Sequence, residues 1–293
     1  MIPPGASLPV PVFTVDVEDW FQVSAFDAHV DRARWDTYES RVECNTHRVL
    51  ALCADTGTRG TFFTLGWVAE RFPALVRAIA DAGHEVAAHG YWHQRIPTMS
   101  EAAFRDDVRR ARAVLEDACG QRVVGYRAPS FSLTDDVPWA TRVLVEEGYT
   151  YDSSRFPISR QGYGTASGQR QPHVIDTPSG PLQEYPPAVW MVAGQRVPVA
   201  GGGWFRQLPL PVIRTGLGAV LASGMPAVFY IHPWEVDPGQ PRLPVGMLTR
   251  VRHYRGLGAA ESRLRTLLRT WRFQSFAGLM RGEAGAPVAA VPA

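Results

Sequence analysis

The chain of 293 residues contains little cysteine and no long hydrophobic segment. Its three cysteines, Cys44, Cys53 and Cys119, form no CxxC motif and no close pair, so neither a disulfide framework nor a thiolate metal site is expected. The most apolar stretch, residues 219–231, is interrupted by Ser, Gly and Pro and is too short for a membrane-spanning helix. We therefore expect no disulfide-stapled scaffold and no transmembrane segment.

An excess of charge of one sign is also missing. The formal net charge is +2 and no dense Lys/Arg run occurs, so we expect neither nucleic acid nor an anionic membrane as a partner. The N-terminal stretch MIPPGASLPVPVF lacks the basic and apolar regions of a signal peptide, from which we expect a cytoplasmic location. With 45% hydrophobic and 20% charged residues, the composition is that of a globular protein.

Short apolar runs alternate with amphipathic segments in the first half of the chain. We expect strands over residues 10–17, 60–65, 84–88, 123–126 and 149–151, and helices over 46–54, 69–82, 100–119 and 138–147. This alternation is typical of an α/β protein with a parallel sheet or barrel. Beyond residue 152 the pattern loosens, and helices over 211–223 and 263–271 flank a strand over 227–231.

Polar residues follow five of these expected strands. The clusters are Asp16–Trp20, His89–His93, Arg127–Phe131, Asp152–Ser154 and His232–Glu235. In a parallel barrel the carboxyl ends of the strands share one face, and active sites form there. We therefore expect the clusters to meet at one mouth of the barrel.

His89 and His93 are four residues apart, so both imidazoles could bind one ion. One further carboxylate would complete a three-ligand site with an open position, as in catalytic zinc centres. The pair is more often a capping and a core histidine, and it lacks the glutamate of the HExxH motif. By itself this spacing is a weak signal.

Asp16 and Glu18 point to the same side of an extended chain. Two like charges at a barrel mouth are costly unless a cation or proton compensates them. One carboxylate acting as a metal ligand and the other as a general base would resolve this cost. A solvated turn is the alternative. Arg127 could orient a carboxylate or lie in a surface turn, and His232 could be a general acid or a core residue.

Tryptophans lie close to the polar clusters. Trp20, Trp92 and Trp234 are each within two residues of one, and Trp204 follows Gly201–Gly203. Because the apolar faces of sugars pack on aromatic rings, this placement favours a glycan groove. The alternative is that the rings fill the ends of the barrel.

Together, the motifs TVDVEDWFQVSAF, GHEVAAHGYWH, YRAPSFS, YDSSRFP, GGGWFRQLP and FYIHPWEVDP resemble the NodB-type polysaccharide deacetylases, carbohydrate esterase family 4. They are most similar to the deacetylases found beside exosortase (PEP-CTERM) exopolysaccharide loci. The resemblance covers about residues 12–271 and implies a distorted (β/α)7 barrel. It also implies metal-dependent removal of acetyl groups from an N-acetylated glycan in exopolysaccharide biosynthesis.

The resemblance suggests a division of the chain. Residues 10–275 would form the deacetylase domain, with a family-specific part from about residue 155. Residues 1–9 would be an N-terminal extension and residues 276–293 a disordered tail.

Roles for single residues follow from the same resemblance. Asp16 matches the base, His89 and His93 the metal-binding imidazoles, Arg127 the residue that orients the base, and His232 the general acid. The expected metal is Zn²⁺, with Co²⁺, Ni²⁺ and Fe²⁺ as alternatives for a site of oxygen and nitrogen ligands.

The third ligand is less clear because the family's two adjacent aspartates are separated here by Val17. Glu18 and Asp19 are both candidates, with a slight preference for Asp19. The family's tyrosine after Arg-x-Pro is replaced by Ser130-Phe131, whose backbone N–H could still bind an oxyanion. The expected substrate contacts are Trp20, Trp92, Pro129, Ser130, Phe131, Trp204 and Trp234.

Two other functions remain open at this point. The same barrel could hydrolyse small amides such as ureides, or the chain could be a non-catalytic glycan-binding relative. The tryptophan-lined segments favour a glycan over a ureide, and the complete set of acids and histidines favours an enzyme.

Overall fold

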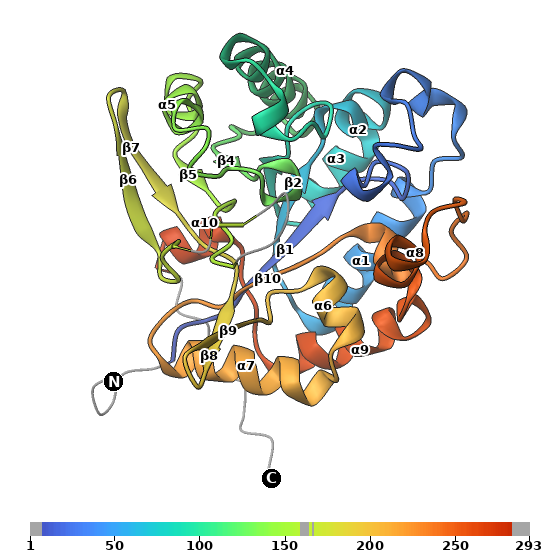
Figure 1. Ribbon diagram of the computed structural model, residues 1–293, viewed down its shortest axis with the longest axis vertical. Helices are drawn as coiled ribbons and strands as arrows, with labels where there is room; N and C mark the ends of the chain where they lie inside the picture. Colours follow the sequence, from blue (N-terminus) through green and yellow to red (C-terminus); the bar gives the residue numbers. More distant parts are fainter. Residues whose placement is uncertain (1–7, 159–163, 166, 283–293) are drawn as a thin grey trace.

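The computed structural model describes residues 8–158, 164–165 and 167–282, and its centre is a curled sheet of eight strands (Figure 1). In spatial order these are β10 (Val228–Ile231), β1 (Val12–Val17), β2 (Thr61–Thr64), β3 (Glu85–Ala88), β4 (Gly125–Tyr126), β5 (Tyr151–Asp152), β7 (Gly180–Glu184) and β6 (His173–Thr177). All neighbours pair in parallel except β6, which is antiparallel to β7. The parallel strands confirm the expected distorted (β/α)7 barrel.

The barrel closes through isolated contacts instead of a continuous strand pair. The N–H of Ala188 donates to the Val228 carbonyl at 3.0 Å, and the N–H of Tyr230 donates to the Ala200 carbonyl at 2.6 Å. Gly201, at φ 134°, lies so close to β10 that a Cβ there would be 1.8 Å from the Tyr230 carbonyl oxygen. Part of the glycine-rich segment before Trp204 therefore serves this closure.

Helices cover the outside of the sheet (Figure 1). They are α1 (Val42–Thr56), α2 (Gly66–Arg71), α3 (Pro73–Asp81), α4 (Glu101–Cys119), α5 (Trp139–Glu146), α6 (Gly202–Gln207), α7 (Leu210–Ala222), α8 (Met247–Tyr254), α9 (Leu257–Thr270) and α10 (Phe276–Met280). Short 3₁₀ turns occur at Ser24–Phe26, Arg32–Thr37, Ile96–Thr98, Pro129–Phe131 and Pro233–Val236, and β8 (Val189–Val192) pairs with β9 (Gln195–Pro198) as a separate hairpin. None of the helices in the described ranges combines the length and apolarity that crossing a bilayer requires.

Local sequence signals explain where several helices begin and end. The Ser100 side chain accepts a hydrogen bond from the N–H of Ala103, and Gly120 ends α4 in the left-handed conformation at φ 67°. The expected helix over 69–82 is two helices, because Pro73 lacks an N–H and starts α3 at a bend after Phe72. Strands β1, β2 and β10 are buried along their whole length, as expected of strands inside a parallel barrel.

The expected disordered tail is wrong for its first residues. Phe276 is fully buried, and its ring packs on Phe63, Tyr151 and Tyr185 with centroids 5.0–6.1 Å apart. The N–H of Phe276 donates to the Thr61 hydroxyl at 2.9 Å. Helix α10 therefore packs against the sheet, while residues 283–293 lie outside the described ranges.

Replacing Phe276 by Ala should lower the free energy of unfolding by about 3–5 kcal/mol, because a buried aromatic ring leaves a cavity. Denaturant unfolding followed by circular dichroism measures this change. Met280→Ala, on the same helix but at a side chain that is 43% exposed, should stay within about 0.5 kcal/mol of wild type. Equal stability of the two variants would show that α10 is not packed in this way.

Candidate metal centre and active site

Three buried side chains meet at the carboxyl ends of β1 and β3. Glu18 follows β1, and His89 and His93 follow β3. Their ligand atoms, one from each residue, all lie within 4.8 Å of one another. The expected cluster of two imidazoles and one carboxylate is therefore present, and its geometry allows a shared cation.

His89 is held in the tautomer that a metal ligand needs. Its Nδ1 lies 2.8 Å from the carbonyl oxygen of Arg127, which can only accept, so Nδ1 carries the proton and Nε2 has a free lone pair. Burial is the main cause that lowers the pKa of His89 to about 4; the charges of Asp16 and Glu18 oppose this shift, and that of His93 adds to it. The ring is therefore neutral at pH 7.

The loop that carries His93 is fixed by a carboxylate that sequence reasoning missed. Asp107, on α4, accepts hydrogen bonds from the N–H groups of Tyr91 at 2.8 Å and Trp92 at 3.1 Å. Gly90, at φ 73°, is required because a Cβ would lie 2.9 Å from an Asp107 oxygen. His93 itself has a positive φ of 50°. The position of Asp107 inside an ordinary amphipathic helix gave no signal of this role.

Glu18 has one oxygen that is hydrogen-bonded and one that is not. Its Oε1 accepts from the indole N–H of Trp234 at 3.0 Å. Its Oε2 is buried without a hydrogen-bond partner, although His93 Nε2 lies only 2.7 Å away. Burial raises the pKa of Glu18, but the charges of His93 and His232 outweigh it and hold this pKa well below its usual range. A carboxylate oxygen this close to an imidazole nitrogen needs a proton or a cation between the two atoms, and a shared cation would bind both.

Asp19 has a different role, which corrects the slight preference for it as the third ligand. Its oxygens accept from the Ser40 hydroxyl at 2.6 Å and from the N–H groups of Arg41, Val42 and Trp20 at 2.9–3.2 Å. Ser40, Arg41 and Val42 lie at and just before the start of α1, so Asp19 caps that helix and fixes the preceding loop. Burial raises the pKa of Asp19 to about 6 despite these donors. The metal-ligand group contains Glu18 and not Asp19.

Arg127 is fully buried, which excludes the surface-turn alternative. Its Nη1 donates to Asp16 Oδ1 and to the Thr14 hydroxyl, both at 2.7 Å. Its Nε donates to the Ser153 carbonyl at 3.0 Å and its Nη2 to the Ser153 hydroxyl at 2.9 Å. Arg127 thus holds one oxygen of the Asp16 carboxylate in a fixed orientation.

His232 lies beside both carboxylates of β1. Its Nε2 is 3.9 Å from Asp16 Oδ2 and 3.7 Å from Glu18 Oε1. Its Nδ1 is 2.7 Å from Glu235 Oε1, and Glu235 Oε2 accepts from Arg206 Nε at 2.6 Å. Burial lowers the pKa of His232, but the charges of Glu18, Glu235 and Asp16 outweigh it and raise this pKa to about 9. The side chain remains 18% exposed and can therefore reach a ligand.

Glu235 and Arg206 were part of quoted motifs but received no role from the sequence. A signal for Glu235 was available: it is three residues after His232, with Pro233 at the first helical position. This is the spacing of a capping box, in which the glutamate accepts from the backbone N–H of the first residue. For Arg206 no local pattern pointed to Glu235.

Two of the expected substrate contacts are wrong. Trp20 is only 3% exposed and donates its indole N–H to the Glu39 carbonyl. Trp234 is 4% exposed, and its ring is stacked between His232 and His253, with centroid distances of 4.9 and 4.3 Å. Both rings fill the end of the barrel, which was the stated alternative.

Of the remaining expected substrate contacts, two are buried and three are partly exposed. Pro129 and Phe131 are buried, and the Phe131 ring packs on other aromatic rings of the core. Trp92, Trp204 and Ser130 are partly exposed and could face a substrate. The Ser130 hydroxyl also donates a hydrogen bond of 2.7 Å to that of Ser24, whose oxygen is 3.5 Å from His93 Nδ1.

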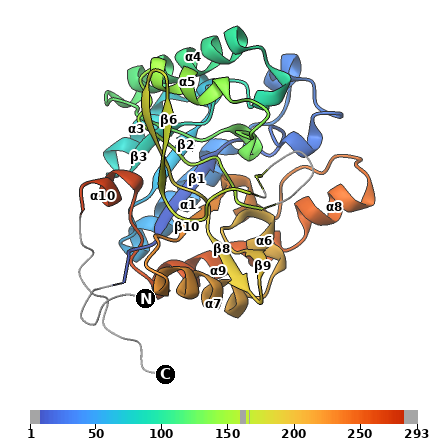
Figure 2. The same cartoon turned by 60° about the vertical axis from the view of Figure 1, so that its left-hand side comes forward.

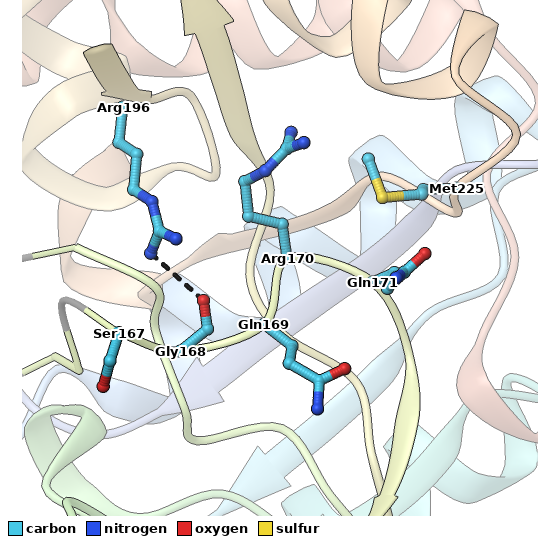
Figure 3. A pocket seen from close by; sticks show the side chains of 7 residues that line it. All are labelled: Ser167, Gly168, Gln169, Arg170, Gln171, Arg196 and Met225. Carbon is cyan, nitrogen blue, oxygen red and sulfur yellow. Dashed lines mark hydrogen bonds between the residues drawn. The ribbon is translucent and has the colours of Figure 1, made fainter. Parts of the chain in front are cut away.

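A hollow elsewhere on the molecule is not part of this centre. Figure 3 shows it lined by residues 167–171 with Arg196 and Met225, and Arg196 donates a hydrogen bond to the Gly168 carbonyl at 3.1 Å. None of the expected catalytic or metal-binding residues lines it.

Comparisons with known families cover nearly the whole chain in two parts. Residues 29–151 match the polysaccharide deacetylase family, and residues 153–281 match a domain of unknown function, DUF3473. The chain carries a polysaccharide deacetylase domain. This domain contains His89, His93 and Arg127, whereas His232 lies in the second matched part.

Curated relatives match part of this chain over part of their own length. A peptidoglycan deacetylase-like protein, FGM2, of Gibberella zeae is 32% identical over 108 residues, which are 37% of this chain and 31% of that protein. The peptidoglycan deacetylase of Helicobacter pylori is 30% identical over 38% of this chain and 37% of its own length. A chitooligosaccharide deacetylase of Bradyrhizobium is 32% identical over 31% and 42%. The chain thus matches about a third of the length of these relatives.

Solved structures share the fold. A Mycobacterium smegmatis protein classed with the polysaccharide deacetylases superimposes with a TM-score of 0.67 at 21% identity, covering 100% of this chain and 97% of that one. The PuuE allantoinase superimposes with a TM-score of 0.61 at 17% identity, covering 95% and 91%. Because proteins of both descriptions share the barrel, the fold alone does not select a substrate.

Replacing Glu18 by Gln should weaken Zn²⁺ binding on the order of a hundredfold, and by at least about tenfold, because a charged ligand is lost. Asp19→Asn should bind Zn²⁺ within a few-fold of wild type, because Asp19 binds backbone and hydroxyl donors instead. Competition with a chromogenic chelator gives both affinities. Retained affinity in Glu18→Gln with loss in Asp19→Asn would return the ligand role to Asp19.

Proposed function

We propose that this chain is a metal-dependent hydrolase that removes acetyl groups from an N-acetylated polysaccharide or oligosaccharide. One observation carries the proposal: the Glu18, His89 and His93 cluster lies beside an arginine-held carboxylate, Asp16, and an imidazole, His232. A metal site with a base and an acid within reach is what amide hydrolysis requires.

Glu18, His89 and His93 would hold the cation, which we propose is Zn²⁺, with Co²⁺, Ni²⁺ and Fe²⁺ as alternatives. The donor set fits, because Glu18 Oε2 has no hydrogen bond and His89 Nε2 has a free lone pair. When bound, such an ion supplies a water that is acidic near pH 7 and polarises the amide carbonyl.

Asp16 serves as the base in this proposal. Arg127 binds its Oδ1, so Oδ2 is the oxygen that accepts the proton of the attacking water. Because the ion pair is buried, the carboxylate cannot rotate away without leaving the Arg127 charge unpaired. Arg127 therefore acts by positioning Asp16 and does not itself touch the substrate.

His232 serves as the acid. In the absence of a cation its pKa is about 9, and Glu235 binds Nδ1, so Nε2 is the atom that donates a proton to the departing amine. Of the backbone donors expected to bind the oxyanion, the Phe131 N–H is already bonded to the Ala128 carbonyl at 3.0 Å. We therefore assign that role to the Ser130 N–H.

The glycan substrate is supported by the named relatives and by the partly exposed Trp92 and Trp204. An exopolysaccharide is the polymer we propose, because the motifs resemble deacetylases found beside exopolysaccharide loci.

Asp16→Asn should reduce acetate release from Zn²⁺-loaded protein acting on chitooligosaccharides by about 10²- to 10⁴-fold, because it removes the base. A matched control is Asp55→Asn, at a carboxylate that is 53% exposed and pairs with Arg265 on the surface. It should keep full activity.

Thermal unfolding of Asp16→Asn must accompany this assay, since the variant removes the charged partner of buried Arg127. Undiminished acetate release by a folded Asp16→Asn would remove Asp16 from the role. Turnover of allantoin-like ureides with none of chitooligosaccharides would favour the small-amide hydrolase. Glycan binding by metal-loaded protein without turnover would favour a binding protein.

The decrease of kcat at alkaline pH, the alkaline limb of the pH profile, should follow the deprotonation of His232. The acid must be protonated, so activity falls as pH rises through the pKa of His232, which is about 9 in the absence of a cation and lower when a cation offsets the charge of Glu18. Glu235→Gln removes a negative charge that raises this pKa, so the limb should move to lower pH. Stopped acetate assays from pH 6 to about 10 measure the shift. An unchanged limb in Glu235→Gln would show that His232 is not the titrating acid.

A further inference from the structure

Helix α8 (Met247–Tyr254) carries a group of apolar side chains on the outside of the molecule. Met247 is 74% exposed, Leu248 62% and Val251 38%. Figure 2 shows α8 standing out from the body of the barrel. Scattered exposed apolar residues are normal, but these three lie within five consecutive residues of one projecting helix.

The segment around this patch is basic and has no acidic residue. Residues 238–260 contain no Asp or Glu. They contain four exposed arginines: Arg242, Arg250, Arg252 and Arg255. The overall charge of +2, from which we expected no anionic membrane as a partner, conceals this local concentration.

Asp27, which follows a residue packed on the buried face of α8, is already paired. Phe26 packs on His253 with ring centroids 4.6 Å apart. The following residue, Asp27, forms an ion pair of 2.9 Å with Arg32. The charge of Asp27 is therefore largely balanced before it can offset the arginines around α8.

The orientation of α8 is fixed from the inside. His253 and Tyr254 are buried, and His253 stacks on Trp234. Arg206 donates hydrogen bonds to the carbonyls of His253 and Arg252, at 2.5 and 3.1 Å. With these anchors in place, the helix cannot turn its apolar side chains into the core, so they stay on the surface.

We propose that α8 docks the protein on the surface of an anionic lipid bilayer. Met247 and Leu248 would enter the boundary between headgroups and acyl chains, and the surrounding arginines would bind anionic headgroups. The arginines around α8 support a bilayer as the partner. An anionic bilayer offers negative headgroups and an apolar interior to any projecting helix, whereas a protein partner would need an acidic surface around a matching apolar groove. Since α8 contacts Trp234, which binds Glu18, docking places the mouth of the barrel near the bilayer surface.

Co-sedimentation of the full chain with sucrose-loaded vesicles tests the proposal. Vesicles of phosphatidylcholine with about 30% phosphatidylglycerol should bind the wild type at least tenfold more tightly than phosphatidylcholine alone, and added NaCl should weaken this binding. Arg250→Gln with Arg252→Gln should lower the partition coefficient about fivefold per arginine. Met247→Ser with Leu248→Ser should lower it by on the order of tenfold or more.

Matched controls change the same residue types elsewhere. Met191→Ser with Val192→Ser removes exposed apolar side chains from β8, and Arg214→Gln with Arg269→Gln removes two exposed arginines. Both controls should bind vesicles as the wild type does, and unchanged melting temperatures should show that all variants are folded.

Three results would overturn the proposal. One is the absence of wild-type binding to anionic vesicles at low salt, and another is an equal loss in the control variants. The third is a dimer that the Met247→Ser, Leu248→Ser variant abolishes while vesicles bind neither protein, which would make a second copy of the chain the occupant. Vesicle binding does not require turnover, so these results are independent of the proposed catalysis.

Discussion

The buried guanidinium of Arg127 determines where the other functional groups at the mouth of the barrel can lie. A fully buried cation must be paired and fully hydrogen-bonded, and its donors bind Asp16, Thr14 and Ser153. The backbone carbonyl of the same residue binds Nδ1 of His89. One residue thus orients the proposed base through its side chain and selects the tautomer of a proposed metal ligand through its main chain.

A second chain of charges completes the site and links the second matched part of the sequence to Asp16 and Glu18, which precede both matched parts. Arg206 binds Glu235, Glu235 binds His232, and His232 lies beside Glu18 and Asp16. His89, His93 and Arg127 belong to the deacetylase match. Arg206, Glu235 and His232 belong to the part of unknown function. That second part is therefore required for the proposed chemistry, because it provides the acid.

The sequence predicted what depends on local signals and missed what depends on long-range contacts. Strand ends, the cap at Ser100 and the stop at Gly120 follow from backbone chemistry that neighbouring residues reveal. The choice between Glu18 and Asp19 depends on Ser40 and Arg41, more than twenty residues away, which no spacing indicates. Similarly, a tryptophan beside a polar cluster shows proximity but not direction, so buried Trp20 and Trp234 were mistaken for a binding surface.

The stacked rings of His232, Trp234 and His253 raise the question of which imidazole can donate a proton. Burial, together with the charge of Arg206, lowers the pKa of His253 to about 3, so His253 stays neutral where His232 is protonated. A charged His253 would repel the proton on His232 through the intervening ring. Because His253 is neutral and its Nε2 is bonded to Gln240 at 2.8 Å, the stack supports His232 mechanically without competing for its proton. The same neutral ring connects α8 to the site through its packing on Trp234.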